Sequence, residues 1–187
     1  MKIFTNRRTN AIKIVPVRKS SFREWVDTQT RFETKWIKGV AFEGDVGNTC
    51  LIPNKDGSLG KVILGASDMP NIWDSGSLPW NLPHGTYTFE GLNDAKTSTL
   101  AALGWGLGAY RFDKYKNSLN LKTLLQWPVD CDRKAVERTL EAVFLVRDLI
   151  NTPAEDMGPS ELEKAARVLT KKFYAKIKVI KGKQLLT

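Results

Sequence analysis

Apolar residues recur along the chain in short alternating or continuous runs, a pattern that indicates strands. We expect strands at 12–17, 40–42, 49–52, 61–65, 87–89, 121–127 and, near the end of the chain, 177–180. Pro16 predicts an edge position for the first strand, because proline has no N–H to donate to a neighbour. Asp56-Gly57 favours a hairpin turn between the third and fourth strands, since this pair tolerates positive φ.

Other segments follow the helical period of 3.6 residues. A short helix is predicted after Ser20 or Ser21, and longer ones at about 94–109, 132–150 and 159–173. The third is the most regular, because its apolar positions follow the i, i+3, i+4, i+7 rule over several turns. Pro153 should end that helix, and Pro159 should begin the next. Strands that alternate with helices imply an α/β sandwich.

Composition narrows the class of protein. The 187 residues suffice for one α/β domain plus an appendage. No apolar run approaches the roughly 20 residues of a membrane-spanning helix, and no apolar segment follows the basic N-terminus as in a secretory signal. Cys50 and Cys131 have no metal-like spacing and are interpreted as reduced thiols of a cytoplasmic protein. We therefore expect no membrane partner.

The net charge of +9 makes nucleic acid a candidate partner. The basic residues are scattered, however, with their densest groups at 7–8, 171–172 and 176–183. Scattered lysines and arginines usually form a solvated surface, so DNA binding is the weaker interpretation.

Candidate chemical groups each have a simpler structural explanation. The spacing of three glycines is similar to that of a phosphate-binding loop; they are Gly104, Gly106 and Gly108. They fall within a predicted helix, however, where close packing explains them better. His84, the only histidine, lies between Pro83 and Gly85, a setting that favours a surface turn.

Acidic residues give no site either. Glu155 and Asp156 are adjacent carboxylates, but they precede a helix start, where acids are favourable. Other aspartates have no recognisable partner; they are Asp68, Asp74, Asp113, Asp130 and Asp132. We therefore assign no catalytic, cofactor-binding or metal-binding residue from the sequence.

Three motifs nevertheless carry a resemblance. Residues 148–159, DLINTPAEDMGP, closely resemble the interdomain segment of the leucyl aminopeptidase (cytosol aminopeptidase) family. Residues 103–115, LGWGLGAYRFDKY, resemble the family's helix and the Tyr-x-Phe-x-x-Tyr after it. Residues 82–87, LPHGTY, resemble the loop into the strand before that helix. The ordered series covers about 73–186 and carries more weight than any single motif.

The resemblance implies a particular domain organisation. Residues 1–131 would form an N-terminal three-layer α/β sandwich similar to a macro domain, and 132–152 an interdomain linker helix. Residues 153–187 would be the beginning of a truncated catalytic domain. Full-length family members remove N-terminal amino acids from peptides with two divalent metals, zinc or manganese, and usually form homo-hexamers. A two-metal site of that kind polarises the scissile carbonyl and activates a water.

The same resemblance leaves the activity of this chain uncertain. The family's metal-binding and catalytic motifs have no equivalents in the 187 residues, so the chain alone should be inactive and hold no metal. The expected function is the assembly or regulatory portion of the aminopeptidase. The alternatives are a nucleic-acid-binding accessory module or, third, a retained nucleotide pocket of the macro-domain kind.

Overall fold

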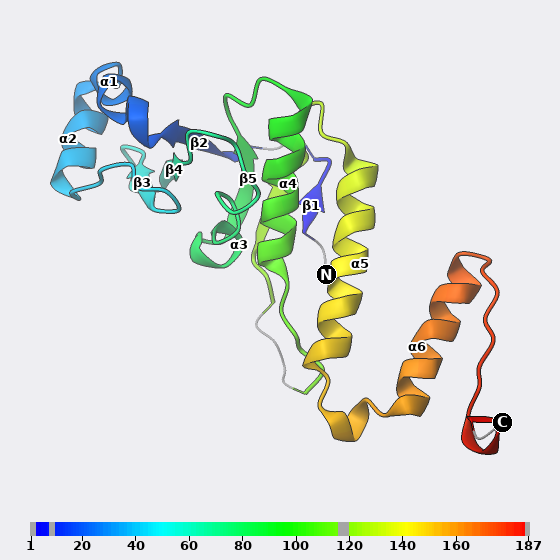
Figure 1. The fold of residues 1–187 in the computed structure, drawn as a ribbon. Coiled ribbons are helices and arrows are strands. Elements are labelled where there is room, and N and C mark those ends of the chain that lie inside the picture. The colour runs from blue at the N-terminus through cyan, green and yellow to red at the C-terminus, as the bar shows by residue number, and fades with distance from the viewer. Residues whose placement is uncertain (1–2, 8–9, 116–119, 186–187) are drawn as a thin grey trace. The chain divides into compact units, whose positions relative to one another are not determined.

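A six-stranded sheet forms the centre of the fold. The computed structural model describes residues 3–7, 10–115 and 120–185. The strands are β1 (Phe4–Thr5), β2 (Ile12–Arg18), β3 (Thr49–Pro53), β4 (Leu59–Ala66), β5 (Gly85–Phe89) and β6 (Thr123–Gln126). They lie in the order β1-β6-β5-β2-β4-β3. Figure 1 labels each of them except β6. All neighbours are parallel except β3 and β4, which form the predicted antiparallel hairpin.

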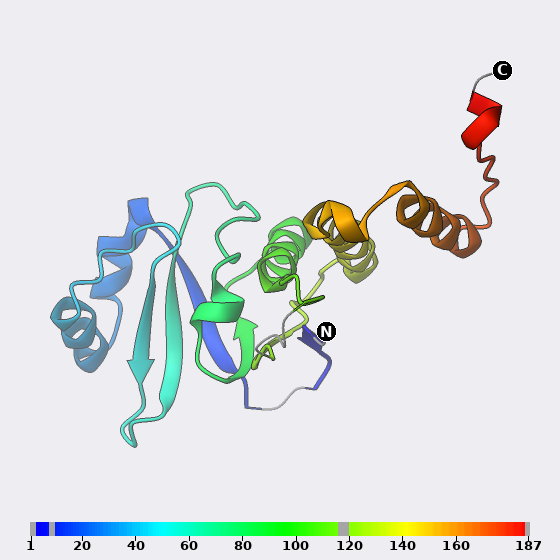
Figure 2. The same ribbon diagram turned by 90° about the horizontal axis from the view of Figure 1, so that it is seen from below.

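Helices pack on both faces of this sheet (Figures 1 and 2). On one face, α1 (Phe22–Asp27) and α2 (Arg31–Gly39) cover β2, β3 and β4, with Ile37 and Ile63 almost fully buried between them. On the other face lie α3 (Leu78–Asn81) and α4 (Ala95–Ala109). The ring centroid of Trp105 on α4 lies 6.0 Å from that of Tyr87 on β5. The mixed α/β class is thus confirmed, while the likeness to a macro domain stays a prediction.

The chain divides into two compact units within α5 (Arg133–Asn151). The first unit comprises residues 1–111 and 118–143 and contains the whole sheet. The second comprises 112–117 and 144–187 and contains α6 (Pro159–Lys172). Its short 3₁₀ turns are Ala154–Asp156 and Gly182–Leu185. The predicted domain limits at 131 and 152 stay a prediction.

Two predicted strands are wrong. Residues 40–42 lie in the turn after α2, a helix that the hydrophobic pattern did not reveal because Ile37 is its only buried residue. Residues 177–180 form no strand, since a strand needs a neighbour to pair with and none is described beside them.

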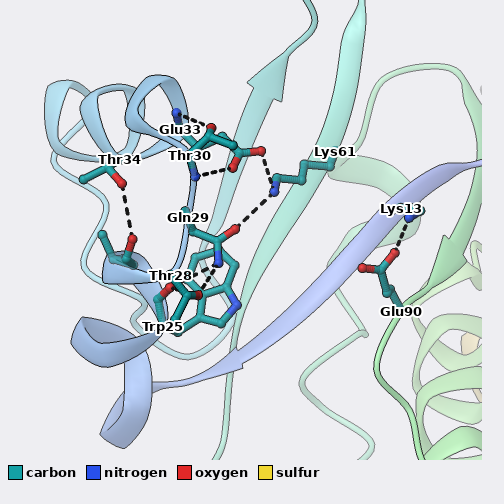
Figure 3. A network of polar contacts seen from close by, with 10 residues as sticks. Lys13, Trp25, Thr28, Gln29, Thr30, Glu33, Thr34, Lys61 and Glu90 are labelled. Carbon is teal, nitrogen blue, oxygen red and sulfur yellow. Dashed lines mark hydrogen bonds and ion pairs between the residues drawn. The ribbon is translucent and has the colours of Figure 1, made fainter.

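An ion pair fastens α2 to the sheet (Figure 3). Lys61 Nζ lies 2.6 Å from Glu33 Oε1, and both side chains are mostly buried. Glu33 also completes a capping box with Thr30 at the start of α2. Burial alone would raise the pKa of Glu33, but its hydrogen bonds to Lys61 and Thr30 together hold that pKa below the usual value. The network fixes α2 against β4.

Candidate functional site

A hollow of the first unit opens at the carboxyl ends of β2, β4 and β5. Its volume is about 130 Å³. Strand β2 lies between β4 and β5, which follow it in the chain but occupy opposite sides. Such a reversal of strand order is where open α/β sheets commonly form ligand crevices. The cavity therefore occupies the position at which a functional site is most expected.

Pro16 explains why the strands part at this point. Strand β2 pairs with β4 through Arg18, but its pairing with β5 ends at Ile14. The carbonyl of Ile14 accepts the last hydrogen bond, from Glu90 N, on the β5 side. Two residues later Pro16 faces the same side without an N–H. The predicted edge position is wrong, because β2 is a central strand of the sheet. Pro16 nevertheless lies where β2 has no pairing on its β5 side.

The floor of the cavity is apolar. Eight of its lining residues have apolar side chains: Pro16, Leu64, Ala66, Pro70, Phe89, Leu92, Leu100 and Ala101. Leu64 is 1% exposed, so this floor is continuous with the core. A largely apolar cavity with a few polar groups at its wall is the usual composition of a small-molecule site.

One wall is the loop between β4 and α3, which is tightly fastened. Asp74 accepts hydrogen bonds from Ser67 N and from Ser67 Oγ, at 3.2 and 2.7 Å. Ser75 Oγ donates to the carbonyl of Ala101 on α4. Gly104 lies so close that an added Cβ would be 2.0 Å from the carbonyl oxygen of Ile72. These contacts hold the wall in place.

Two charged groups of opposite sign line this cavity. Asp74 is half-buried and Arg18 is exposed at the rim. Neither has an ion-pair partner among the described residues, including each other. The Asp74 carboxylate accepts two hydrogen bonds from Ser67, and an ionised carboxylate has about four acceptor sites, so acceptor sites remain for a ligand. The cavity thus offers a carboxylate and a guanidinium to whatever enters it.

The glycines of α4 serve close packing, as their position in a helix predicts. An added Cβ would lie 2.3 Å from Leu140 Cδ1 at Gly106, and 1.7 Å from the carbonyl oxygen of Gly76 at Gly108. Helix α4 therefore approaches α5 and the wall loop more closely than any side chain would allow.

His84 lies exposed in the loop before β5, as predicted. The hydroxyl of Tyr87 donates to the carbonyl of Pro83 across this loop, at 2.6 Å. Burial raises the pKa of Tyr87 to about 12, so the phenol stays protonated and keeps this bond. This bond gives Pro83 and Tyr87 a structural role beside His84.

In the second unit, the last residues of the 103–115 motif contact the 148–159 segment. Tyr115 donates a short hydrogen bond to Asp156, and Lys114 Nζ lies 3.7 Å from the same carboxylate. The bond from Tyr115 and the charge of Lys114 lower the pKa of Asp156. Asp156 is therefore used in a structural contact, and Glu155 is exposed beside it. The sequence did not indicate this pairing, since its partners are 41 positions apart.

The remaining candidates do not assemble. Asp68 accepts a hydrogen bond from Ser20, and Asp132 caps α5 through Ala135 N. Burial raises the pKa of the Cys50 thiol, as expected of an inert buried cysteine. In the described parts of the chain, no three His, Cys, Asp or Glu side chains are placed to hold a metal ion. The described residues therefore do not fit a two-metal centre.

Comparison with known proteins identifies the family. Residues 12–128 match the model of the M17 aminopeptidase N-terminal domain. This chain belongs to the M17 aminopeptidase family. The match covers most of the sheet unit, including every strand except β1.

Curated M17 relatives agree with this assignment. The probable cytosol aminopeptidase of Wolinella succinogenes is 28% identical over 182 residues, which is 86% of this chain and 36% of that protein. The probable cytosol aminopeptidase of Aeropyrum pernix is 33% identical over 82 residues, or 43% of this chain and 17% of its own length. The chain thus spans 36% of the length of the first relative and 17% of the length of the second.

Solved structures share the M17 fold. The cytosol aminopeptidase of Coxiella burnetii superposes with a TM-score of 0.87 at 39% identity, over 96% of this chain and 39% of that one. Tomato leucine aminopeptidase gives a TM-score of 0.68 at 13% identity, over 92% and 42% of the two chains, a likeness of fold alone.

Across the described ranges, no helix combines the length and apolarity needed to cross a membrane.

Proposed function

We propose that this chain is the N-terminal, assembly or regulatory portion of an M17 exopeptidase that removes N-terminal amino acids from peptides. The observation that carries the proposal is the match of residues 12–128 to the family's N-terminal domain. The superposition on the Coxiella burnetii enzyme over 96% of this chain supports it. Peptides would bind through the part of the enzyme that lies outside the matched domain.

The proposal includes the properties of the whole enzyme. Two divalent metals, zinc or manganese, would serve the peptidase, and one neighbour of 19% identity is described in complex with Mn. The metals would be held outside the described residues, which contain no suitable ligand group. The whole enzyme would be cytoplasmic, in keeping with relatives described as cytosol aminopeptidases. It would form a homo-hexamer, as the family resemblance implies.

Peptidase activity gives the first test. The purified chain is incubated with leucine p-nitroanilide and either Mn²⁺ or Zn²⁺. We expect no hydrolysis above the metal-only blank, because the described residues supply no group of ligands for a metal ion. Metal-dependent hydrolysis that coelutes with the chain would refute the predicted inactivity.

The size of the protein in its source cells gives the second test. An antibody raised against this chain should detect a band more than twice the 21.0 kDa of the chain, which would support a portion of a full aminopeptidase. A sole band at 21.0 kDa would contradict that proposal. The DNA-binding alternative would then be tested by gel shift with duplex DNA at low and high salt, since phosphate contacts weaken steeply with salt.

A further inference from the structure

We propose that the cavity at the carboxyl ends of β2, β4 and β5 binds a free aliphatic α-amino acid. The side chain would enter the apolar floor, the ammonium group would face Asp74, and the carboxylate would face Arg18. The assignment rests on the cavity and its two charges, not on the peptidase assignment.

The size and chemistry of the floor select a small apolar side chain. An apolar protein cavity of about 150 Å³ accommodates benzene, and this one measures about 130 Å³. An isobutyl or sec-butyl group is smaller than benzene, so it fits with the amino-acid backbone at the mouth. A charged side chain would lose its hydration against Leu64 and Leu100 without a partner there.

Asp74 selects an ammonium group. Its carboxylate accepts two hydrogen bonds from Ser67 and has no ion pair among the described residues. Ser67 Oγ already donates to Asp74 and accepts from Asn71, so this hydroxyl has little left for a ligand. The lone pairs remaining on Asp74 are thus the strongest acceptors of the cavity, and an ammonium group supplies both the donors and the missing charge.

Arg18 selects a carboxylate, and the same walls disfavour a phosphate. The N-terminus of α4 could have attracted an anion, but Asp94 already occupies it by accepting from Thr97 N at 2.8 Å. A phosphate would also meet the charge of Asp74. One carboxylate at the exposed guanidinium, with the ammonium group deeper, matches both charges at once. These walls favour a zwitterion over the nucleotide of the macro-domain hypothesis.

An aliphatic amino acid is also the class of product that the proposed exopeptidase releases. A site for it in the N-terminal domain would make that domain a sensor of product. This link depends on the proposed function, whereas the binding itself does not. A binding assay on this chain needs no peptidase activity, so its failure would leave the proposed function intact.

Calorimetric titration of the whole chain with L-leucine at neutral pH tests the proposal. We expect saturable binding with a dissociation constant of about 1 mM or tighter. Leucinamide lacks the carboxylate and 4-methylpentanoate lacks the ammonium group, and each should bind at least about tenfold more weakly. Glutamate should not bind. Absence of leucine binding at about 10 mM, or equal binding of the analogues, would overturn the assignment.

Two variants with matched controls locate the site. Asp74→Asn keeps an oxygen for Ser67 but removes the charge, and Arg18→Gln removes the guanidinium. Each should weaken leucine binding at least about tenfold. Asp27→Asn and Arg23→Gln, at exposed positions of α1, should bind as the parent does. If Asp74→Asn does not fold, the analogue series still decides the outcome. Unchanged leucine affinity in folded Asp74→Asn would place the ligand elsewhere and refute the proposal.

Discussion

Helices α4 and α6 are nearly equal in length, at 15 and 14 residues, but differ in how much of each is covered. Helix α4 buries six residues between the sheet, the wall loop and α5. Helix α6 buries none: Leu162 is 56% exposed, and Phe173, just after the helix, is 63% exposed. Its apolar stripe has no cover among the residues described for its own unit.

The difference shows that an apolar stripe in the sequence indicates which face of a helix can be buried, but not whether another segment covers that face. Helix α4 is apolar on several sides and carries three glycines, so other segments approach it from more than one direction. Helix α6 is amphipathic, with charged residues opposite its stripe. Its stability must therefore come largely from local terms such as the Arg167–Glu163 ion pair.

Truncating one aromatic residue from each helix region should give the largest contrast. Trp105 is fully buried, so Trp105→Ala should lower the free energy of unfolding of the sheet unit by about 3–5 kcal/mol. Phe173→Ala should change it by less than about 0.5 kcal/mol, because the ring is exposed. Chemical denaturation followed by tryptophan fluorescence measures both, with circular dichroism for the variant that loses a tryptophan. Similar losses in the two variants would show that the comparison is wrong.

A methyl group added to α4 sharpens the comparison by the sign of its effect. Gly→Ala within an exposed helix stabilises by up to about 1 kcal/mol. Gly104→Ala should instead destabilise by about 1–3 kcal/mol, because its Cβ would collide with the carbonyl of Ile72. Gly39→Ala in α2 is the matched control, since nothing lies within 4 Å of its added Cβ. Thermal melts should move in opposite directions, and a stabilised Gly104→Ala variant would contradict the close packing of α4.

The smallest expected effect concerns how α2 is fastened. Glu33→Gln removes the negative charge that pairs with Lys61. It should lower the free energy of unfolding by about 1–2 kcal/mol, between the values for exposed and buried ion pairs. The folded pKa of Glu33 is lowered, so its stabilisation is fully present above the unfolded pKa near 4.5 and is lost as pH falls through the lower folded value.

The pH dependence of unfolding separates this ion pair from general acid effects. Between neutral pH and about pH 3, the parent should lose more stability than Glu33→Gln. Glu24→Gln, at an exposed position of α1, should follow the parent curve. Parallel curves for the parent and Glu33→Gln would mean that the ion pair adds nothing to folding.

The local elements were predictable because their signals lie within a few residues. Asp132 before a regular apolar stripe predicted α5, and Asp56-Gly57 predicted the hairpin, where Gly57 has a φ of +83°. Helix α2 was missed although Thr30 and Glu33 carry the spacing of a capping box. Its outer face exposes Phe32 and Trp36, which obscured the helical period.

The candidate site was less predictable than the fold. Asp74 and Arg18 were visible as residues, but they are 56 positions apart in the chain, and neither belongs to a motif. Only the order of the strands brings both to one cavity. Pro16 signalled a break in strand pairing, but its meaning depended on which strands lay on either side.

The sequence by itself determined the helices α4, α5 and α6, the hairpin and, through ordered motifs, the family, because these depend on local period, turn chemistry and short residue patterns. The tertiary structure alone decided that β2 is central, that Asp156 pairs with Tyr115, and that Asp74 and Arg18 line one cavity. These are contacts between residues distant in the chain, and their formation depends on how whole elements pack rather than on any local preference.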